Sequence, residues 1–366
     1  MKEITIDVDS LFLISDIHFG VRSDASEWIK NMHDYFFNFF IPLIDREKTL
    51  KSGVFVLGDV FDNRETLNIE VVNIAIKVFS VLSKHVPVYC IVGNHDMYKK
   101  VDNEINSLRI LKSLPNIHII EENTLCKIKD IDTTILAMPY TTNNEKASNI
   151  LNNTKVKYAF LHSDLVGFRY DNGRNILSGI NTSTFSGYKI FSGHIHKRQE
   201  SDTVIYIGSP YHTKRSDIGN TKGIYKIDLV NDTEQFFANN YSPIFQKWDI
   251  LKLLDKPFKD IKTIFRNNYT DIIINKKYVS SINVAEIMNV LRETGYKKVE
   301  FITVENEDGD YDNNQVLDTM DTLTIDEAIE KRLVDMSLTK ERSKEIFKLT
   351  GYYKELVNNQ IEKIDN

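Results

Sequence analysis

The sequence predicts an α/β protein, and two patterns in its first 242 residues support this fold class. Five short apolar runs rich in Val, Ile, Phe and Tyr each end abruptly at Asp, Asn or His, at residues 11–15, 54–58, 88–93, 158–161 and 188–193. Runs of this length and composition are typical of buried strands. Helix-like stretches lie between them, so we expect strands layered against helices.

The stretch 65–84 has the clearest helical pattern between these strands. One apolar stripe consists of Leu67, Val71, Ile74, Val78 and Leu82, and a second consists of Val72, Ile76 and Phe79. A helix that is apolar on two faces packs against the sheet and against something else. The second stripe is either ordinary core or a contact surface for another chain.

The pattern changes after about Ser242, and the sequence predicts four parts: 1–242, 246–304, 305–323 and 324–366. The second part reads as a small α+β unit, with strands at 270–275 and 297–304 and a helix at 283–295. The third is an acidic linker. The last reads as two amphipathic helices, the first opened by a capping box of Thr324 and Glu327. These helices either cover the chain's own core or bind a partner.

Composition narrows the possible classes of protein. A hydrophobic content of 42% in 366 residues argues against disorder over most of the chain. The start of the chain does not resemble a signal peptide, no apolar stretch is long enough to span a membrane, and two cysteines imply no disulfide framework. We therefore expect a cytoplasmic protein with reduced thiols.

The net charge of −6 argues against a protein that coats nucleic acid through bulk positive charge. Residues 305–330 carry much of the acidic excess, so any contact with DNA should come from the preceding body of the chain. Basic residues beside the strand ends are candidates for contacts with phosphates: Lys99, Lys100, Lys197, Arg198, Lys214 and Arg215. Each of them could equally be a solvated loop charge.

Metal-ligand residue types follow the predicted strands. They are Asp16 and His18, Asp59 and Asp62, Asn94, His95 and Asp96, His162, and His194 and His196. Carboxylate, amide and imidazole groups without thiolate suit Mn²⁺, Mg²⁺ or Fe²⁺, with Zn²⁺ also possible. Seven ligand-type residues exceed what one catalytic ion can use, whereas two ions about 3.5–4 Å apart would accommodate them.

Such a site suits the hydrolysis of a phosphodiester. The substrate is anionic and repels hydroxide, so the reaction needs charge neutralisation, a deprotonated water and stabilisation of the leaving oxygen. Two cations supply all three.

The ordered series D-x-H, G-D-x-x-D, G-N-H-D, a lone His and G-H-x-H, over residues 11–196, resembles the calcineurin-like metallophosphoesterase superfamily. The stretch YIGSPYHTKRSDIGNTKGIYKIDL at 206–229 is similar to the Gly-Ser-Pro segment of SbcD-type double-strand-break repair nucleases and of phage recombination endonuclease subunits. The resemblance implies a metallophosphoesterase α/β sandwich with a small α+β capping domain and C-terminal helices.

The resemblance also implies roles for individual residues. One metal ion would be held by Asp16, His18, Asp59 and His196, and a second by Asp59, Asn94, His162 and His194, with Mn²⁺ as the first choice. His95 would lie over the substrate phosphate and stabilise the transition state or protonate the leaving oxygen. Asp96 would orient His95, and Asp62 would lie behind the ligands.

Two positions depart from the family pattern. Ser163 follows His162 where many relatives carry Gly, and His212 stands in GSPYHTKR at a place often taken by another residue. His212 is either a surface residue or a contact in the substrate groove. His33, His85 and His118 lack a motif context, so we expect them to be structural.

The resemblance favours a metal-dependent DNA exo/endonuclease of recombination and double-strand-break processing. Its partners would be DNA, an SMC-like coiled-coil ATPase bound through the C-terminal helices, and a second copy bound through the helix at 65–84. A phosphatase or small-molecule phosphodiesterase on the same fold is one alternative. A catalytically silent protein-binding scaffold is another, and the complete ligand set argues against it.

Overall fold

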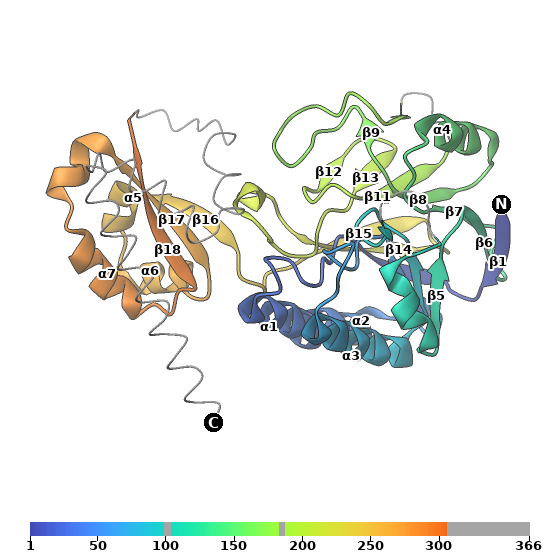
Figure 1. Ribbon diagram of the computed structural model, residues 1–366, viewed down its shortest axis with the longest axis horizontal. Helices are drawn as coiled ribbons and strands as arrows, with labels where there is room; N and C mark the ends of the chain where they lie inside the picture. Colours follow the sequence, from blue (N-terminus) through green and yellow to red (C-terminus); the bar gives the residue numbers. More distant parts are fainter. Residues whose placement is uncertain (99–103, 183–186, 306–366) are drawn as a thin grey trace. The chain divides into compact units, whose positions relative to one another are not determined.

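The computed structural model describes residues 1–98, 104–182 and 187–305 (Figure 1). The predicted helices of 324–366, nearly all of the acidic linker, and Lys99 and Lys100 lie outside the described residues. Two mixed β-sheets and the helices that cover them make up most of the described chain. The predicted α/β class is therefore confirmed. No helix among the described residues combines the length and the apolar character needed to cross a bilayer.

The first sheet has six strands in the order β15-β14-β2-β3-β4-β5. Its four parallel strands are β2 (Ser10–Ile14), β3 (Ser52–Val56), β4 (Val88–Ile91) and β5 (Ile117–Ile120), and β14 (Gly223–Asp228) and β15 (Thr233–Ala238) join antiparallel at one edge. Every residue of β2, β3 and β4 is buried. Burial on both faces explains why their sequences are continuously apolar.

The second sheet has seven strands in the order β1-β6-β7-β8-β11-β13-β12. They are β1 (Lys2–Ile6), β6 (Thr124–Ile128), β7 (Thr134–Met138), β8 (Tyr158–His162), β11 (Lys189–Gly193), β12 (Gln199–Glu200) and β13 (Val204–Tyr206). A short ladder of β9 (Leu165–Val166) and β10 (Ile180–Asn181) follows β8 in the chain. The five predicted strands thus divide between two sheets: β2, β3 and β4 in the first, and β8 and β11 in the second.

The sheets pack face to face around an aromatic core. Phe55 of the first sheet meets Phe160 of the second edge to face, with ring centroids 4.8 Å apart, and Phe191 continues the cluster. Helices cover the outer faces, as Figure 1 shows. Those over the first sheet are α1 (Ser26–Tyr35), the π-helical turn η1 (Phe36–Phe40), α2 (Ile41–Glu47), α3 (Ile69–His85) and η3 (Ser107–Ser113), and α4 (Asn144–Asn153) covers the second.

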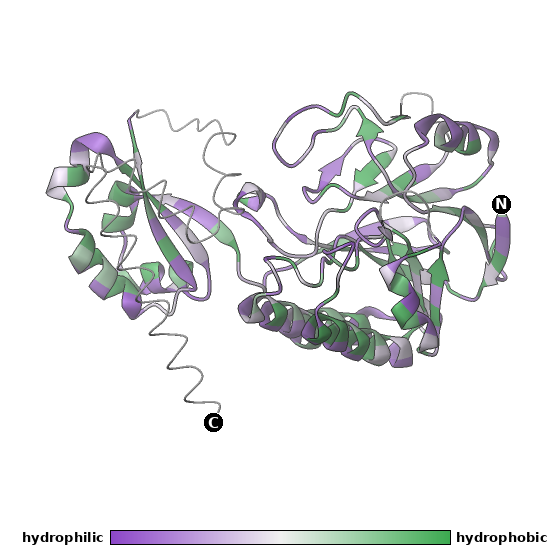
Figure 2. Cartoon of the chain, in the orientation of Figure 1, coloured by the Kyte–Doolittle hydropathy of each residue, from purple (hydrophilic) through white to green (hydrophobic). Residues whose placement is uncertain are grey.

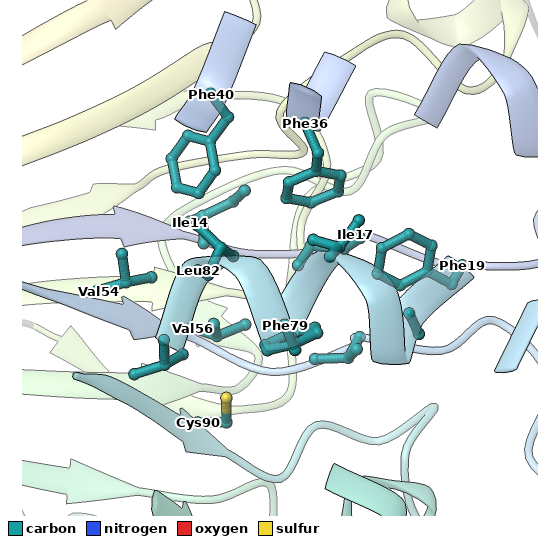
Figure 3. Close-up of a cluster of buried hydrophobic side chains, with 14 of the residues drawn as sticks. Ile14, Ile17, Phe19, Phe36, Phe40, Val54, Val56, Phe79, Leu82 and Cys90 are labelled. Atoms are coloured by element: carbon teal, nitrogen blue, oxygen red, sulfur yellow. The ribbon is translucent and has the colours of Figure 1, made fainter. Parts of the chain in front are cut away.

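Figure 3 shows the core beneath α3, where Phe79 and Leu82 face Val54, Val56 and Cys90 of the sheet. Both cysteines are buried free thiols, as expected for Cys90. The helix begins after Asn68, whose side chain accepts a hydrogen bond from the Glu70 N–H.

The two stripes predicted on this helix differ in burial. The first is largely buried, and Phe79 of the second joins it in the core. Val72 and Ile76 remain only partly buried, and Ile69 is 79% exposed. Figure 2 shows green, hydrophobic colouring along much of this helix.

Residues 245–304 form a separate three-stranded parallel sheet in the order β16-β17-β18. Its elements are β16 (Phe245–Asp249), α5 (Ile250–Leu254), α6 (Phe258–Phe265), β17 (Tyr269–Asn275), the 3₁₀ turn η6 (Lys276–Ser281), α7 (Val284–Arg292) and β18 (Lys298–Val304). A core of its own includes Phe265, Ile272 and Leu291. The predicted strand, helix and strand are all present, and the domain boundaries stay a prediction.

Candidate metal centre

The ends of five strands from the two sheets meet at one place. Asp16 and His18 follow β2, Asp59 follows β3, and Asn94 follows β4. His162 is the last residue of β8, and His194 and His196 follow β11. The loops after β2, β3 and β4 are therefore joined by residues from the facing sheet, and all seven predicted ligands converge.

Glycines allow the loops to come this close. A Cβ atom at Gly93 would lie 2.2 Å from Asp59 Oδ1, and one at Gly193 would lie 2.0 Å from Ser15 Oγ. Both separations are shorter than any van der Waals contact allows. The Gly before Asn94 and the Gly before His194 therefore leave the space in which the strand ends meet.

Four of the seven predicted ligands have a left-handed backbone. The φ angles are 53° at Asp16, 50° at His18, 53° at Asp59 and 86° at His194. This region is unfavourable for residues with a Cβ atom, and such strain persists where the surrounding structure enforces it, often at functional sites. The fold therefore holds these side chains in place at a conformational cost.

The first group of side chains surrounds the Nε2 atom of His18. His196 Nε2 lies 3.0 Å from it, Asp59 Oδ2 3.7 Å and Asp16 Oδ1 3.9 Å. Asp16 Oδ1 is also 3.9 Å from His196 Nε2. These atoms belong to the four residues predicted for one metal ion.

The second group surrounds the amide oxygen of Asn94. His162 Nε2 lies 2.9 Å and His194 Nδ1 2.7 Å from Asn94 Oδ1. His162 Nε2 is also 3.2 Å from Asp59 Oδ2, the oxygen that the first group contacts. Asp59 therefore lies in both groups, where a shared ligand was predicted.

Each imidazole in these groups has an oxygen behind its other ring nitrogen. His18 Nδ1 lies 3.0 Å from Asp62 Oδ1, and His162 Nδ1 donates to the Leu57 carbonyl at 2.6 Å. Metal-binding histidines in proteins usually have such a partner, which fixes the ring orientation. Asp62 thus lies beside the ring of the predicted ligand His18, and its supporting role stays a prediction.

Two further carboxylates lie near the outer ring nitrogens of the H-x-H pair. Asp164 Oδ1 lies 3.3 Å from His194 Nε2, and Asp171 Oδ2 lies 3.8 Å from His196 Nδ1. Neither was singled out in the sequence. Asp164 could have been found from its place in LHSD, two residues after His162, whereas Asp171 lies in a loop without any motif.

The donor set fits a cation, and His162 shows why. Its Nδ1 donates to Leu57, so a neutral ring would point the Nε2 lone pair at the oxygens of Asn94 and Asp59. This arrangement is repulsive unless a proton or a metal ion lies between the atoms. Burial lowers the pKa of His162, but the Asp59 carboxylate outweighs it and raises the pKa to about 9. A bound metal ion would replace that proton.

His95 stands beside both groups but belongs to neither predicted set. Its Nδ1 donates to the Asp62 carbonyl at 2.6 Å, and its backbone N–H donates to Asp59 Oδ1 at 2.7 Å. Only Nε2 remains for another partner. Ligand atoms of His18, Asp59 and His95 also lie within 4.8 Å of one another, so this trio forms a competing candidate group. Burial lowers the pKa of His95 despite the nearby Asp59 charge.

The structure corrects the expected role of Asp96. Its buried carboxylate accepts hydrogen bonds from the backbone N–H groups of Asp59, Val60, Phe61 and Gly93, at 2.9–3.1 Å. It therefore holds the loop after β3 against the loop after β4, and the Asp62 carbonyl orients the His95 ring instead. Each Asp96 oxygen accepts two backbone hydrogen bonds, and the hydrogen bond of the His95 ring goes to the Asp62 carbonyl.

The structure decides against one of the two alternatives for His212. It is 7% exposed, and its Nδ1 accepts a hydrogen bond from the Phe245 N–H at 3.3 Å. Burial lowers its pKa to about 4, so the ring is neutral. The surface alternative for this residue is therefore wrong.

Most of the described basic candidates for phosphate contacts are already paired. Arg198 bonds Glu200, Lys214 lies 2.9 Å from Asp171, and Arg215 bonds Asp271 through two nitrogens. Among the four candidates that the described ranges include, only the Lys197 side chain lacks an ion pair with an acidic residue. The sequence could not show these pairs, because Arg215 and Asp271 are 56 residues apart.

Two residues beside the groups were not expected from the sequence. Arg64 Nε donates to the Asn94 carbonyl at 2.9 Å, and the Tyr140 ring lies 5.7 Å from that of His194 between centroids. Neither belongs to a metal-ligand residue type that the sequence patterns select. Both lie on the side of the centre formed by the loop after β4 and by His194.

The chain is similar in sequence to a known protein family and to several viral proteins. A family model described as calcineurin-like phosphoesterase matches residues 10–198. Exonuclease subunit 1 of Enterobacteria phage T4 is 27% identical over 238 residues, covering 62% of this chain and 67% of the phage protein. A candidate phosphoesterase of Invertebrate iridescent virus 3 is 25% identical over 217 residues, covering 55% of this chain and 57% of that protein. An uncharacterised protein of Acanthamoeba polyphaga mimivirus is 24% identical over 396 residues, covering 98% of this chain and 27% of that protein.

Proposed function

Because this chain belongs to the calcineurin-like phosphoesterase family, whose members use divalent metal ions, we propose that it is a two-metal phosphodiesterase that hydrolyses DNA. The observation that carries the proposal is the pair of ligand groups that share Asp59. A phosphodiester needs charge neutralised on both sides of the phosphorus, and two adjacent cations do this.

The ligand assignment follows the two groups. Asp16, His18, Asp59 and His196 would hold one ion, and Asp59, Asn94, His162 and His194 the other, with Mn²⁺ as the proposed metal. When bound, such ions supply a deprotonated water at neutral pH and neutralise the phosphate charge. The absence of thiolate among the donors favours a harder ion over a structural zinc site.

The chain's own residues would orient the substrate and move a proton. His95 keeps its Nδ1 on the Asp62 carbonyl, so its Nε2 is the atom available to the phosphate or the leaving oxygen. Asp96 fixes the loops that carry Asp59 and His95 through four backbone hydrogen bonds. Asp62, Asp164 and Asp171 place carboxylate oxygens 3.0, 3.3 and 3.8 Å from the outer ring nitrogens of His18, His194 and His196.

The phage T4 relative supports DNA as the substrate class. Its name describes an exonuclease subunit, and the similarity covers 62% of the present chain. The separate sheet at 245–304 adds a surface that a small phosphate ester would not require. We extend the proposal to recombination and double-strand-break processing, in line with the Gly-Ser-Pro segment at 206–229.

Release of nucleotides from linear DNA in the presence of Mn²⁺ tests this proposal. A chromogenic phosphate monoester serves as the competing substrate, and a chelator serves as the control for metal dependence. We expect DNA to be the better substrate. Turnover of the monoester without any release from DNA would support the phosphatase alternative, and inactivity on both would support a silent scaffold.

The proposed partners are an SMC-like ATPase and a second copy of the chain. The word subunit in the name of the T4 relative favours a multi-subunit enzyme. The predicted helices of 324–366 lie outside the described residues, and we propose that they bind the ATPase. A chain truncated after residue 320 should keep basal Mn²⁺-dependent activity and lose co-purification with the ATPase. Equal co-purification of both forms would contradict this assignment.

The surface proposed for a second copy is the partly exposed stripe of α3. Ile69 is 79% exposed there, next to half-buried Val72 and Ile76. Ile69→Glu with Ile76→Glu should shift the chain from dimer to monomer in sedimentation. A monomeric wild type, or a dimer unaffected by both charges, would exclude this surface.

A further inference from the structure

Arg64 is a cation that the fold places beside the candidate metal centre. It lies in the loop between β3 and α3, two residues after Asp62, and is only partly exposed. The turn around it is fixed, because the Asn63 side chain accepts hydrogen bonds from the N–H groups of Glu65 and Thr66 at 2.9 and 3.2 Å. Arg64 therefore projects from an ordered loop.

One hydrogen bond fixes the guanidinium against the loop after β4. Arg64 Nε donates to the backbone carbonyl of Asn94 at 2.9 Å. Asn94 is the residue whose side-chain oxygen contacts His162 and His194, and the next residue is His95. The positive charge is thus held at the junction of a predicted ligand and the residue proposed to act on the phosphate. This hydrogen bond uses only Nε, so both Nη groups can donate hydrogen bonds to another partner.

The charge of Arg64 has no acidic partner in the part of the chain that the structure describes. Two other partly buried arginines differ in this respect. Arg198 bonds Glu200, and Arg215 bonds Asp271 and Glu300. A guanidinium that is partly shielded from water is less favourable without a counterion than with one. An anion that binds at this place would compensate the charge.

We propose that Arg64 binds a non-bridging oxygen of the substrate phosphate through its Nη groups, on the His95 side of the metal centre. This inference rests on the proposed function and adds a substrate-binding residue to it. The geometry suits the task, since a planar guanidinium donates paired hydrogen bonds to a phosphate group. The bond from Nε to Asn94 orients that plane before the substrate arrives.

The proposal predicts a loss of phosphate affinity without a loss of metal. The test measures binding of inorganic phosphate to the Mn²⁺-loaded full chain by calorimetry, for wild type, Arg64→Gln, Arg64→Lys and Arg46→Gln. Arg46→Gln is the matched control, because Arg46 lies on α2 and pairs with Glu47. We expect phosphate affinity to fall about 10- to 100-fold in Arg64→Gln, the range for losing hydrogen bonds to a charged group. Arg64→Lys should recover part of the phosphate affinity, because lysine keeps the positive charge but lacks the paired N–H donors of the guanidinium.

Metal content and substrate kinetics separate this role from a structural one. Arg64→Gln should bind as much Mn²⁺ as wild type, and its KM for a phosphodiester should rise by the same factor as the phosphate dissociation constant. Equal phosphate affinity in Arg64→Gln and wild type would overturn the proposal. So would loss of metal or of folding in both Arg64 variants, since this shows that the bond to Asn94 is structural.

The outcomes also distinguish this inference from the proposed function. Weaker phosphate binding in Arg64→Gln, combined with no hydrolysis of DNA by wild type, would keep Arg64 as a phosphate ligand and remove the nuclease proposal. Hydrolysis of DNA by wild type, combined with unchanged phosphate binding in Arg64→Gln, would keep the nuclease proposal and remove Arg64 as a phosphate ligand.

Discussion

Replacement of His95 by Ala separates two explanations for this residue. In the first, His95 acts on the substrate phosphate through Nε2, because Nδ1 is bonded to the Asp62 carbonyl. In the second, His95 binds a metal ion with His18 and Asp59, whose ligand atoms lie within 4.8 Å of its own. The proposed mechanism requires the first.

The structure sets the size of the expected effect. The substitution removes one acid–base group, which lowers the chemical step by about 10²–10⁴-fold, or roughly 3–5 kcal/mol in the barrier. The side chain makes one hydrogen bond, to the Asp62 carbonyl, so the free energy of unfolding should fall by only about 1–2 kcal/mol. The His95 backbone N–H can keep its bond to Asp59 Oδ1.

The assay combines single-turnover cleavage of DNA with calorimetric titration of Mn²⁺. We expect His95→Ala to bind two ions with affinities close to those of wild type and to cleave far more slowly. Loss of one ion in the titration would refute the reasoning, because it would make His95 a ligand. A rate within a few-fold of wild type would also refute it.

Three further predictions follow from the same contacts. Asp59→Asn removes the one carboxylate that both groups share, so Mn²⁺ affinity and nuclease rate should fall by more than about 100-fold. Near-normal rates at saturating Mn²⁺ would exclude a shared ligand. Asp171→Asn and Asp164→Asn should each lower Mn²⁺ affinity or activity about 10–100-fold in calorimetry and rate assays, whereas Asp202→Asn on the surface should change neither. The third concerns pH: because the folded-state pKa of His162 is raised from 6.5 to about 9, its stabilising effect is complete below pH 6.5 and is lost as pH rises through 9. The free energy of unfolding of the chelator-treated protein should therefore fall by roughly 3 kcal/mol over this window, and a flat or rising profile in chemical denaturation would contradict the Asp59–His162 contact.

The strands and the ligand types could be predicted from the sequence because both are local signals. Each apolar run and the polar residue that ends it are contiguous, as in the run that ends at Asp59 or the one that ends at Asn94. The division of these strands between two sheets could not be read in this way. It depends on the pairing of β8 with β7 and β11, which only the folded chain shows.

The residues that support the ligands were harder to predict for the same reason. Asp171 reaches His196 from a loop whose own sequence contains no motif. Asp96 lies in the G-N-H-D motif, but its four hydrogen bonds come from backbone N–H groups. Such partners cannot be recognised from the sequence, because nearly every residue type has a backbone N–H. The sequence thus indicated which residues belong to the centre more reliably than what each one contacts.

Anomalous scattering from crystals grown with Mn²⁺ tests the two-metal account most directly. The account predicts two peaks about 3.5–4 Å apart, with Asp59 bound to both and His95 bound to neither. A single peak, or a peak coordinated by His18, Asp59 and His95 together, would contradict it.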